Sequence, residues 1–186
     1  MERKWEVRFS GTGGQGIIRA AVILAQAALY DGFDATQSQS YGPESRGGST
    51  KGEVVIDDEI IYYPKVTKPN LVLCLSKEAY LKYAADVRDG GVLVLDSFYC
   101  PEDDRVPDTV KVYRFPIVDL ARDEIQNELS ANVLALGIMV GLTNVVSKSA
   151  VIDSLAVNFK AKIIPVNQKA FEYGYQLAKD TLAQER

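Results

Sequence analysis

The chain has 186 residues, of which 47% are hydrophobic and 25% charged. This composition is typical of a soluble globular protein, and the length predicts a single domain that spans residues 1–186. Its net charge of −4 provides no basic surface for nucleic acid, and no polybasic stretch is present to attract an anionic membrane. No apolar run follows residues 1–5, so no secretory signal is predicted. The longest apolar stretch, residues 133–142, is about half the ~20 residues that span a bilayer. We therefore expect a cytoplasmic protein.

The residue types also limit the chemistry. The chain has no histidine, and so lacks the commonest general base, the commonest zinc ligand and any histidine-dependent nucleophile triad. An iron–sulfur cluster needs about four thiolates, whereas this chain has only Cys74 and Cys100, which lie outside any metal-ligand spacing. No metal site is therefore predicted. Cys74 lies in an apolar stretch and is expected to be buried, while Cys100, beside Pro101, is interpreted as a loop residue for which a reactive thiol is an open alternative.

The first predicted elements are a strand, a glycine-rich turn and a helix. Residues 5–10 alternate apolar and polar side chains, as a strand does, and residues 14–30 are then predicted to form a helix that is apolar almost all round. Such a helix is expected to be covered on two sides, by its own sheet and by a second layer for which a partner subunit is a candidate. Gly32 ends the helix, and residues 33–38 are predicted as the next strand.

The middle of the chain is predicted to contain a hairpin and then buried strands. Residues 53–56 and 60–63, joined by an acidic turn, are expected to pair as a β-hairpin. Short apolar runs suited to buried parallel strands follow, with a helix between the first two of them. The predicted strands are residues 71–75, 92–95 and 110–115, and the helix is residues 77–87.

The rest of the chain is predicted to be helical. The expected helices are residues 118–128, residues 131–145, a helix capped by Ser147 that ends at residue 156, and residues 167–183. Gly137 and Gly141 lie four residues apart and indicate close approach of another element, with core packing favoured over a subunit interface. The order of the elements predicts an α/β fold: a Rossmann-like single domain with a mostly parallel sheet, a β-hairpin and a helical C-terminal part.

The strongest functional signal is the segment Gly11-Thr12-Gly13-Gly14-Gln15-Gly16, between the first strand and the first helix. A turn of this kind gathers backbone N–H groups that can hold an anionic phosphate. A dinucleotide fits poorly, because the acidic residue expected about 20 positions later is represented only by Asp34, which starts its strand instead of ending it. A P-loop is excluded because no Gly-Lys-Ser/Thr follows. A tight turn without a ligand is the remaining alternative.

A second glycine-rich segment runs from Tyr41 to Ser49, with the sequence Tyr-Gly-Pro-Glu-Ser-Arg-Gly-Gly-Ser. Its Gly-Pro pair indicates a turn, and its Gly-Gly pair permits backbone geometry closed to other residues. Arg46 offers a fork of donors suited to phosphate or carboxylate; an ion pair with Glu44 is the alternative. The two segments together are more specific than either alone.

These two segments resemble the gamma subunit of the 2-oxoacid:ferredoxin oxidoreductases, and the resemblance covers nearly the whole chain. The Tyr-Gly-Pro-Glu-x-Arg-Gly-Gly form is most like the 2-oxoglutarate branch. The similarity extends to residues 61–64, residues 90–96, Asn132 with residues 136–137, and residues 167–171 with Gly174.

The resemblance implies an enzyme that oxidatively decarboxylates a 2-oxoacid, forms an acyl-CoA and reduces ferredoxin or a similar acceptor. It further implies that the gamma-type chain helps to bind coenzyme A, that it has no catalytic residue and that it is not active alone. Thiamine diphosphate and iron–sulfur clusters would lie on partner subunits. The expected partners are alpha and beta subunits, a delta subunit as a further candidate, and ferredoxin through the complex.

On this hypothesis the glycine turn offers donors to phosphate, and the second segment closes the site. The expected coenzyme A-binding residues are Gly11, Thr12, Gly13, Gly14, Gln15, Ser40, Tyr41 and Arg46. Two other hypotheses belong to different classes. One is a purely architectural subunit that organises the catalytic chains, supported by the apolar helix at residues 14–30. The other is an independent nucleotide-dependent oxidoreductase, which the absent histidine and the absent ribose-binding acid disfavour.

Overall fold

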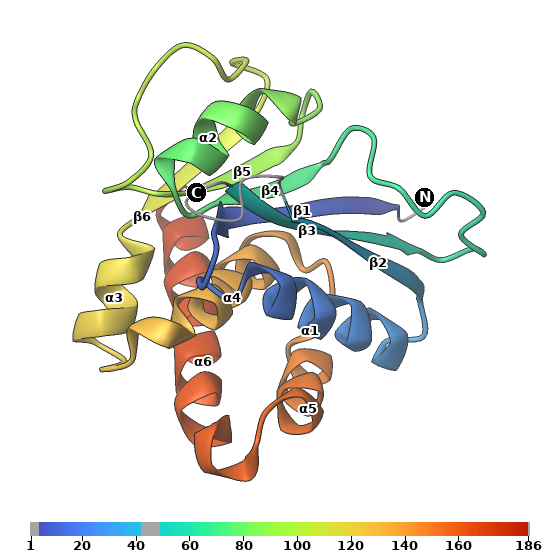
Figure 1. Ribbon diagram of the computed structural model, residues 1–186, viewed down its shortest axis with the longest axis vertical. Helices are drawn as coiled ribbons and strands as arrows, with labels where there is room; N and C mark the ends of the chain where they lie inside the picture. The colour runs from blue at the N-terminus through green and yellow to red at the C-terminus, as the bar shows by residue number, and fades with distance from the viewer. Residues whose placement is uncertain (1–3, 42–48, 186) are drawn as a thin grey trace.

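The computed structural model describes residues 4–41 and 49–185, which form a six-stranded sheet with helices on both faces (Figure 1). Strands β1, β4, β5 and β6 are parallel to one another, and β3 lies antiparallel between β1 and β2. The expected α/β, Rossmann-like fold with a mostly parallel sheet is therefore confirmed. In spatial order the strands are β2 (Asp34–Tyr41), β3 (Ser49–Asp57), β1 (Trp5–Thr12), β4 (Leu71–Cys74), β5 (Val92–Asp96) and β6 (Lys111–Phe115).

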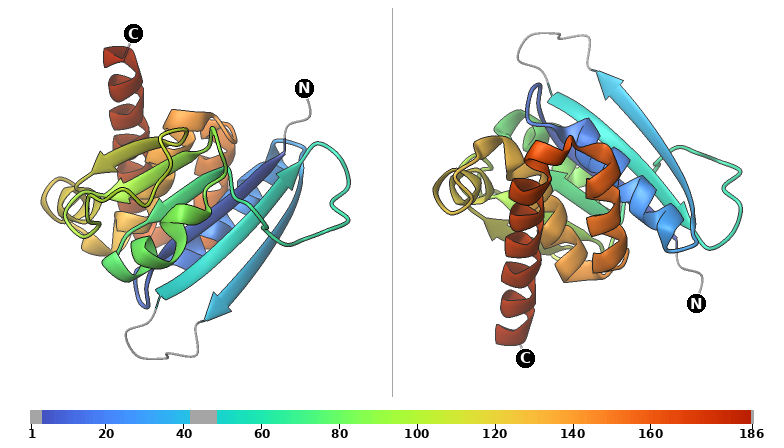
Figure 2. Two further views of the ribbon diagram at one scale, coloured as in Figure 1. Left: turned by 90° about the horizontal axis from the view of Figure 1, so that it is seen from above. Right: turned by 90° about the horizontal axis from the view of Figure 1, so that it is seen from below.

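The helices divide unequally between the two faces of the sheet. Helix α2 lies on one face, and α1, α4, α5 and α6 lie on the other, as the views from above and below show (Figure 2). Side-chain alternation along the strands serves both layers: in β4, Leu71 and Leu73 join the larger core, while Val72 and Cys74 join the core beneath α2. The helices are α1 (Ile17–Tyr30), α2 (Lys77–Tyr83), α3 (Ile117–Asp123), α4 (Ala131–Thr143), α5 (Lys148–Asn158) and α6 (Ile164–Gln184).

A β-hairpin is present, but it is formed by β2 and β3, and the predicted pairing of residues 53–56 with 60–63 was wrong. Strand β3 pairs with β2 on one side and with β1 on the other, so neither of its edges is available to residues 60–63. Those residues form no strand; the side chains of Ile60 and Tyr62 are 69% and 89% exposed. The segment is tied back where the Ile61 N–H donates to Asp34 Oδ2 at 2.9 Å.

The apolar helix α1 is covered on its second side by the same chain. Ser154, on α5, donates its hydroxyl to the carbonyl oxygen of Ile23 at 3.0 Å, and Ala27 and Ala28 are fully buried. Helix α5, and not a partner subunit, therefore supplies this cover. The apolar character of α1, which favoured an architectural role, is explained by packing within the chain. Helix α1 begins at Ile17, later than predicted, because the turn before it has left-handed backbone angles.

The glycines of α4 and α6 let these helices pack with almost no space between their backbones. A Cβ on Gly137 would overlap the carbonyl oxygen of Phe171 and lie 2.9 Å from the Tyr175 nitrogen, and a Cβ on Gly174 would overlap the Leu134 carbonyl. The preferred interpretation, core packing, is confirmed for Gly137. The prediction that Ser147 caps the next helix is also confirmed, because its hydroxyl accepts the Ala150 N–H at 3.1 Å.

The two cysteines are buried side by side beneath α2. Cys74 is fully buried and Cys100 is 3% exposed, and the Cys100 thiol donates to the Cys74 carbonyl oxygen at 3.3 Å. Burial raises the pKa of each thiol to about 12. The reactive alternative for Cys100 is therefore not supported, because a reactive cysteine needs an accessible thiolate. No helix in residues 4–41 and 49–185 is long and apolar enough to cross a membrane.

Candidate functional site

A crevice is expected where neighbouring parallel strands send their following helices to opposite faces of a sheet. Strands β1 and β4 are such a pair: α1 follows β1 on one face, and α2 follows β4 on the other (Figure 1). The carboxyl end of β1 leads into the glycine turn, residues 13–16, which therefore lies at this position. The glycine turn is thus placed at the position where α/β folds commonly bind ligands.

The pairing of β3 brings both ends of the second glycine-rich segment to the same edge. Thr12 pairs with Ser49, and Tyr41 pairs with Thr50, so the described residues on either side of the segment flank the glycine turn. Residues 42–48, including Arg46, lie outside the described residues, as does the Tyr41 side chain. The two motifs that are separate in sequence therefore converge on one edge of the sheet.

Asp34 is far from this edge. It pairs with Asp57 at the opposite end of β2, and its carboxylate accepts the N–H of Ile61. A dinucleotide site needs an acidic residue beside the glycine turn to bind the ribose. The position of Asp34 therefore agrees with the prediction that NAD or FAD fits this chain poorly.

The glycine turn is held in shape by its own side chains. Gln15 Oε1 accepts the backbone N–H of Thr12 at 2.8 Å, and Gln15 Nε2 donates to the Leu75 carbonyl oxygen at 3.4 Å. Gly11 leaves the space for this contact, because a Cβ there would overlap Gln15 Oε1. Thr12 N and the Gln15 amide are therefore engaged within the turn.

The exposed donors of the turn belong to Gly13 and Gly14. Within the described part of the chain, no hydrogen bond involves the backbone N–H of either residue. The first intrahelical bond of α1 runs from Ala20 N to Gly16 O, so the N–H groups before Ala20 have no acceptor within the helix. The turn and the helix N-terminus together present partial positive charge suited to an anion.

Asn132, on α4, supports the turn from below. Its Nδ2 donates to the Gly16 carbonyl oxygen at 2.9 Å, and the residue is 3% exposed. Its Oδ1 is buried without a hydrogen-bond partner in the described structure. Sequence reasoning did not assign this residue a role, although an asparagine inside the apolar stretch of α4 is a recognisable signal.

A groove of about 630 Å³ opens beside the turn and is lined by Gly14, Gly16 and Asn132. Its far wall comes from the end of α5 and the start of α6, and includes Asn158 and Lys160. The volume is within the range of small-molecule sites. The groove thus adds a concave surface to the exposed glycine turn.

Arg19 spans this groove from α1. Its Nη1 donates to the Asn158 carbonyl oxygen at 2.7 Å, and its guanidinium lies 5.4 Å from the ring centre of Phe159. Sequence reasoning missed this contact because it joins residues 139 positions apart. The groove is therefore assembled from three distant segments of the chain.

The remaining predicted residue, Ser40, lies exposed on β2 opposite Lys51. Lys51 Nζ is 3.0 Å from Glu53 Oε1, and the same carboxylate oxygen is 2.7 Å from Arg8 Nε. The positive charge of Lys51 is therefore already paired. Ser40 stands at the edge that carries the glycine turn, and its contact with a ligand remains a prediction.

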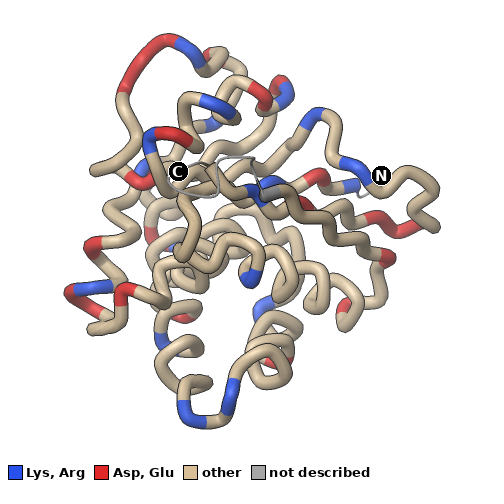
Figure 3. The backbone as a smooth tube through the Cα atoms, in the orientation of Figure 1, with Lys and Arg blue, Asp and Glu red and all other residues tan. Residues whose placement is uncertain are grey.

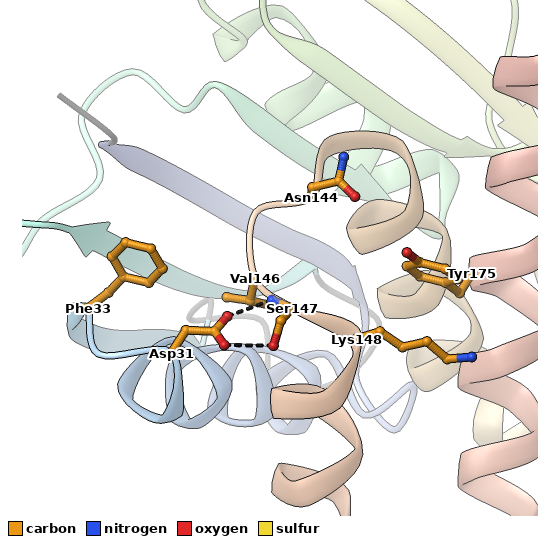
Figure 4. Close-up of a pocket in the computed structure, with 7 residues that line it drawn as sticks. All are labelled: Asp31, Phe33, Asn144, Val146, Ser147, Lys148 and Tyr175. Carbon is orange, nitrogen blue, oxygen red and sulfur yellow. Dashed lines mark hydrogen bonds between the residues drawn. The ribbon is translucent and has the colours of Figure 1, made fainter. Parts of the chain in front are cut away.

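A second hollow, of about 410 Å³, lies near the other end of α1 and includes Asp31, Ser147, Lys148 and Tyr175 (Figure 4). Asp31 accepts the Ser147 N–H at 2.5 Å and the Ser147 hydroxyl at 2.6 Å. The N-terminus of α5 is therefore already occupied by a carboxylate of the same chain. This makes the second hollow a poorer site for an anion than the groove beside the glycine turn.

Comparison with known proteins gives one consistent family. The family model described as pyruvate ferredoxin/flavodoxin oxidoreductase matches residues 6–177. The 2-oxoglutarate synthase subunit KorC from Methanocaldococcus jannaschii is 46% identical over 180 residues, covering 94% of each chain.

Two solved structures are similar in fold and sequence. The gamma subunit of a keto/oxoacid ferredoxin oxidoreductase from Geobacter sulfurreducens has a TM-score of 0.83 and 43% identity, and the match covers 94% of this chain and 98% of that one. The 2-oxoglutarate:ferredoxin oxidoreductase from Magnetococcus marinus, solved with 2-oxoglutarate, coenzyme A and succinyl-CoA bound, has a TM-score of 0.85 and 26% identity, over 95% of this chain and 31% of that one.

Proposed function

The chain belongs to the pyruvate ferredoxin/flavodoxin oxidoreductase family, and we propose that it is a gamma subunit that helps a 2-oxoglutarate-type oxidoreductase to bind coenzyme A. Residues 1–186 would act as one gamma-type domain within the complex. The observation that carries the proposal is the convergence of the two glycine-rich segments, through the Thr12–Ser49 and Tyr41–Thr50 pairs, at the crevice between β1 and β4. That edge presents donors for the phosphates of the ligand.

The roles of the predicted residues divide into two groups. Gly13 and Gly14 would donate backbone N–H groups to phosphate, while Gly11, Thr12 and Gln15 keep the turn in shape. Ser40, Tyr41 and Arg46 would approach the same ligand from the second segment.

Thiamine diphosphate and the iron–sulfur clusters are assigned to partner subunits in this proposal. The residues of this chain do not fit a cluster: its only two cysteines are buried, and the thiol of Cys100 is bonded to the carbonyl of Cys74. The alpha and beta subunits, with a delta subunit as a further candidate, would hold these groups and pass electrons to ferredoxin. This chain would therefore contribute binding and not redox chemistry.

The test is the Michaelis constant (KM) for coenzyme A in the reconstituted complex. Arg46→Ala is expected to raise that KM about tenfold or more, by removing charge-assisted hydrogen bonds to phosphate, with little change in turnover at saturating coenzyme A. Arg105→Ala, on the loop between β5 and β6 and paired with Asp103 at 2.8 Å, is the matched control.

The alternative, an architectural subunit, predicts a different result. In that case Arg46→Ala would reduce the amount of intact complex on gel filtration while leaving the KM for coenzyme A unchanged. An unchanged KM in an intact complex would contradict the proposed role of Arg46.

A further inference from the structure

All the described charged side chains that line the groove beside the glycine turn are positive. Among the described residues that line it, only Arg19 and Lys160 are charged, although the whole chain has a net charge of −4. Neither has an ion-pair partner within residues 4–41 and 49–185. Figure 3 shows basic residues at the turn between α5 and α6, where Lys160 lies. Cations that converge on a hollow without carboxylates are suited to an anionic ligand.

The position of Arg19 is fixed by contacts that leave part of its guanidinium available. One Nη atom donates to the Asn158 carbonyl oxygen, and the plane lies over Phe159. The remaining N–H groups have no acceptor in the described structure. An arginine held in this way can present its fork of donors to a phosphate with little further loss of side-chain freedom.

A buried polar atom gives independent support for a ligand. Asn132 lines the groove and is only 3% exposed. Its Oδ1 nevertheless has no hydrogen-bond partner in the part of the chain that the structure describes. Leaving such an atom unpaired is costly, so a functional reason for it is expected. A ligand in the groove that carries hydrogen-bond donors would supply the missing partner once the Asn132 side chain turns toward it, because its Oδ1 has no exposed surface in this structure.

We infer that this groove binds the nucleotide end of coenzyme A, with Arg19 and Lys160 contacting its 3′-phosphate. The inference rests on the proposed function. The glycine turn would hold the diphosphate, because its donors are backbone N–H groups at a helix N-terminus. The adenosine 3′-phosphate then extends into the groove, where it meets side-chain cations, the Phe159 ring and the amide of Asn132.

The shape and chemistry of the groove favour this end of the molecule over the pantetheine arm. Pantetheine has no charge and would leave Arg19 and Lys160 without an anion. The nucleotide end has a phosphate for the two cations and a heteroaromatic base with donors and acceptors, and the groove is lined by the polar side chains of Asn127, Ser130 and Asn167. The volume of about 630 Å³ accommodates such a group.

The experiment compares coenzyme A with dephospho-coenzyme A, which lacks only the 3′-phosphate, as substrates of the reconstituted complex. For Lys160→Ala we expect the KM for coenzyme A to rise about tenfold and the KM for dephospho-coenzyme A to stay within twofold of the unmodified complex. Lys162→Ala is the matched control, because Lys162 is exposed two residues further along but does not line the groove. It should leave both constants unchanged.

Two outcomes would overturn the inference: an unchanged KM for coenzyme A in Lys160→Ala, or equal increases for both substrates. A variant of the glycine turn, Gly13→Ala, distinguishes failure of this inference from failure of the proposed function. If Gly13→Ala raises the KM for coenzyme A while Lys160→Ala does not, coenzyme A binds the turn but its 3′-phosphate is not in the groove. If neither variant changes the KM, the proposed function fails as well.

Discussion

The side chain of Asn132 donates to the backbone carbonyl of Gly16 at 2.9 Å, so that helix α4 holds the last residue of the glycine turn in place. The two residues are 116 positions apart, and the contact joins the C-terminal helical layer to the candidate site. The Gly16 carbonyl also accepts the Ala20 N–H at 3.1 Å. Loss of Asn132 would therefore free the turn without leaving that carbonyl unpaired.

This contact predicts that Asn132→Leu weakens the binding of coenzyme A with little change in the stability of the fold. The leucine removes one hydrogen bond together with the unpaired Oδ1, and the Gly16 carbonyl keeps the bond from Ala20, so no buried group loses its last partner. The free energy of unfolding should therefore change by less than about 1 kcal/mol. The KM for coenzyme A in the reconstituted complex should rise severalfold because the turn is no longer fixed. Urea denaturation and steady-state kinetics measure the two effects; a stable variant with an unchanged KM would show that the contact does not serve binding.

Gly16 and Gly13 form a matched pair within the turn. Gly16 has a φ of +72°, and a Cβ there would lie 2.5 Å from Asn132 Nδ2. Gly16→Ala should therefore lower the free energy of unfolding by about 2 kcal/mol or more, since the left-handed conformation alone costs roughly 1–2 kcal/mol. Thermal or urea denaturation of the isolated chain measures this loss, and a stability equal to that of the unmodified protein would contradict the geometry.

The other member of the pair tests the ligand itself. Nothing lies within 4 Å of a Cβ on Gly13, and its φ is outside the left-handed region, so Gly13→Ala should fold with unchanged stability, within about 0.5 kcal/mol. The new methyl group would project from the exposed turn beside the free N–H groups. We expect the KM for coenzyme A to rise about tenfold, equivalent to about 1.4 kcal/mol of binding. Equal kinetics for Gly13→Ala and the unmodified complex would exclude close approach of a phosphate at this residue.

The local parts of the site could be predicted from the sequence, and the parts that depend on tertiary pairing could not. The glycine turn is encoded within four consecutive residues, 13–16, between a recognisable strand and a recognisable helix, so its position followed from periodicity. The hairpin prediction failed because residues 60–63 have strand-like side chains but no free strand edge to pair with. Pairing is decided by the whole sheet, which local propensity does not describe.

The groove was even less predictable from the sequence than the strand pairing. Arg19 was recognisable only as a polar position on an apolar helix, and Lys160 only as one charge between two helices. Their relationship depends on α5 packing against α1, which brings the Asn158 carbonyl to the guanidinium. Asn132 differs, because a buried amide in an apolar helix is visible in the sequence as a residue in need of a partner.

The buried cysteines predict loss of stability at alkaline pH. Burial raises the pKa of each thiol in the folded chain to about 12, from an ordinary value of about 9. Because the folded pKa is raised, the contribution to stability is complete below pH 9 and is lost progressively as the pH rises toward 12. Between pH 8 and pH 10 each thiol should lower the free energy of unfolding by roughly 1 kcal/mol.

Urea denaturation at the two pH values, under reducing conditions, measures that loss. Between pH 8 and pH 10 the Cys100→Ala chain should lose roughly 1 kcal/mol less of its free energy of unfolding than the unmodified chain loses, whatever its stability at pH 8. The same pH dependence in both proteins would mean that Cys100 ionises as readily in the folded chain as in the unfolded one.

The packing of α4 on α6 leads to a prediction whose sign distinguishes helix propensity from tertiary contact. Alanine is more favourable than glycine in a helix by about 1 kcal/mol, so propensity alone predicts that Gly137→Ala stabilises the protein. The structure predicts the reverse, because the new Cβ would overlap the Phe171 carbonyl oxygen and crowd the Tyr175 nitrogen, forcing the two helices apart. Overpacking of this kind typically costs 1–3 kcal/mol, and two backbones that meet at a glycine have no side chain able to move aside. We therefore expect a net loss of about 2 kcal/mol in the free energy of unfolding by urea denaturation, and a gain would contradict the close approach of α4 and α6.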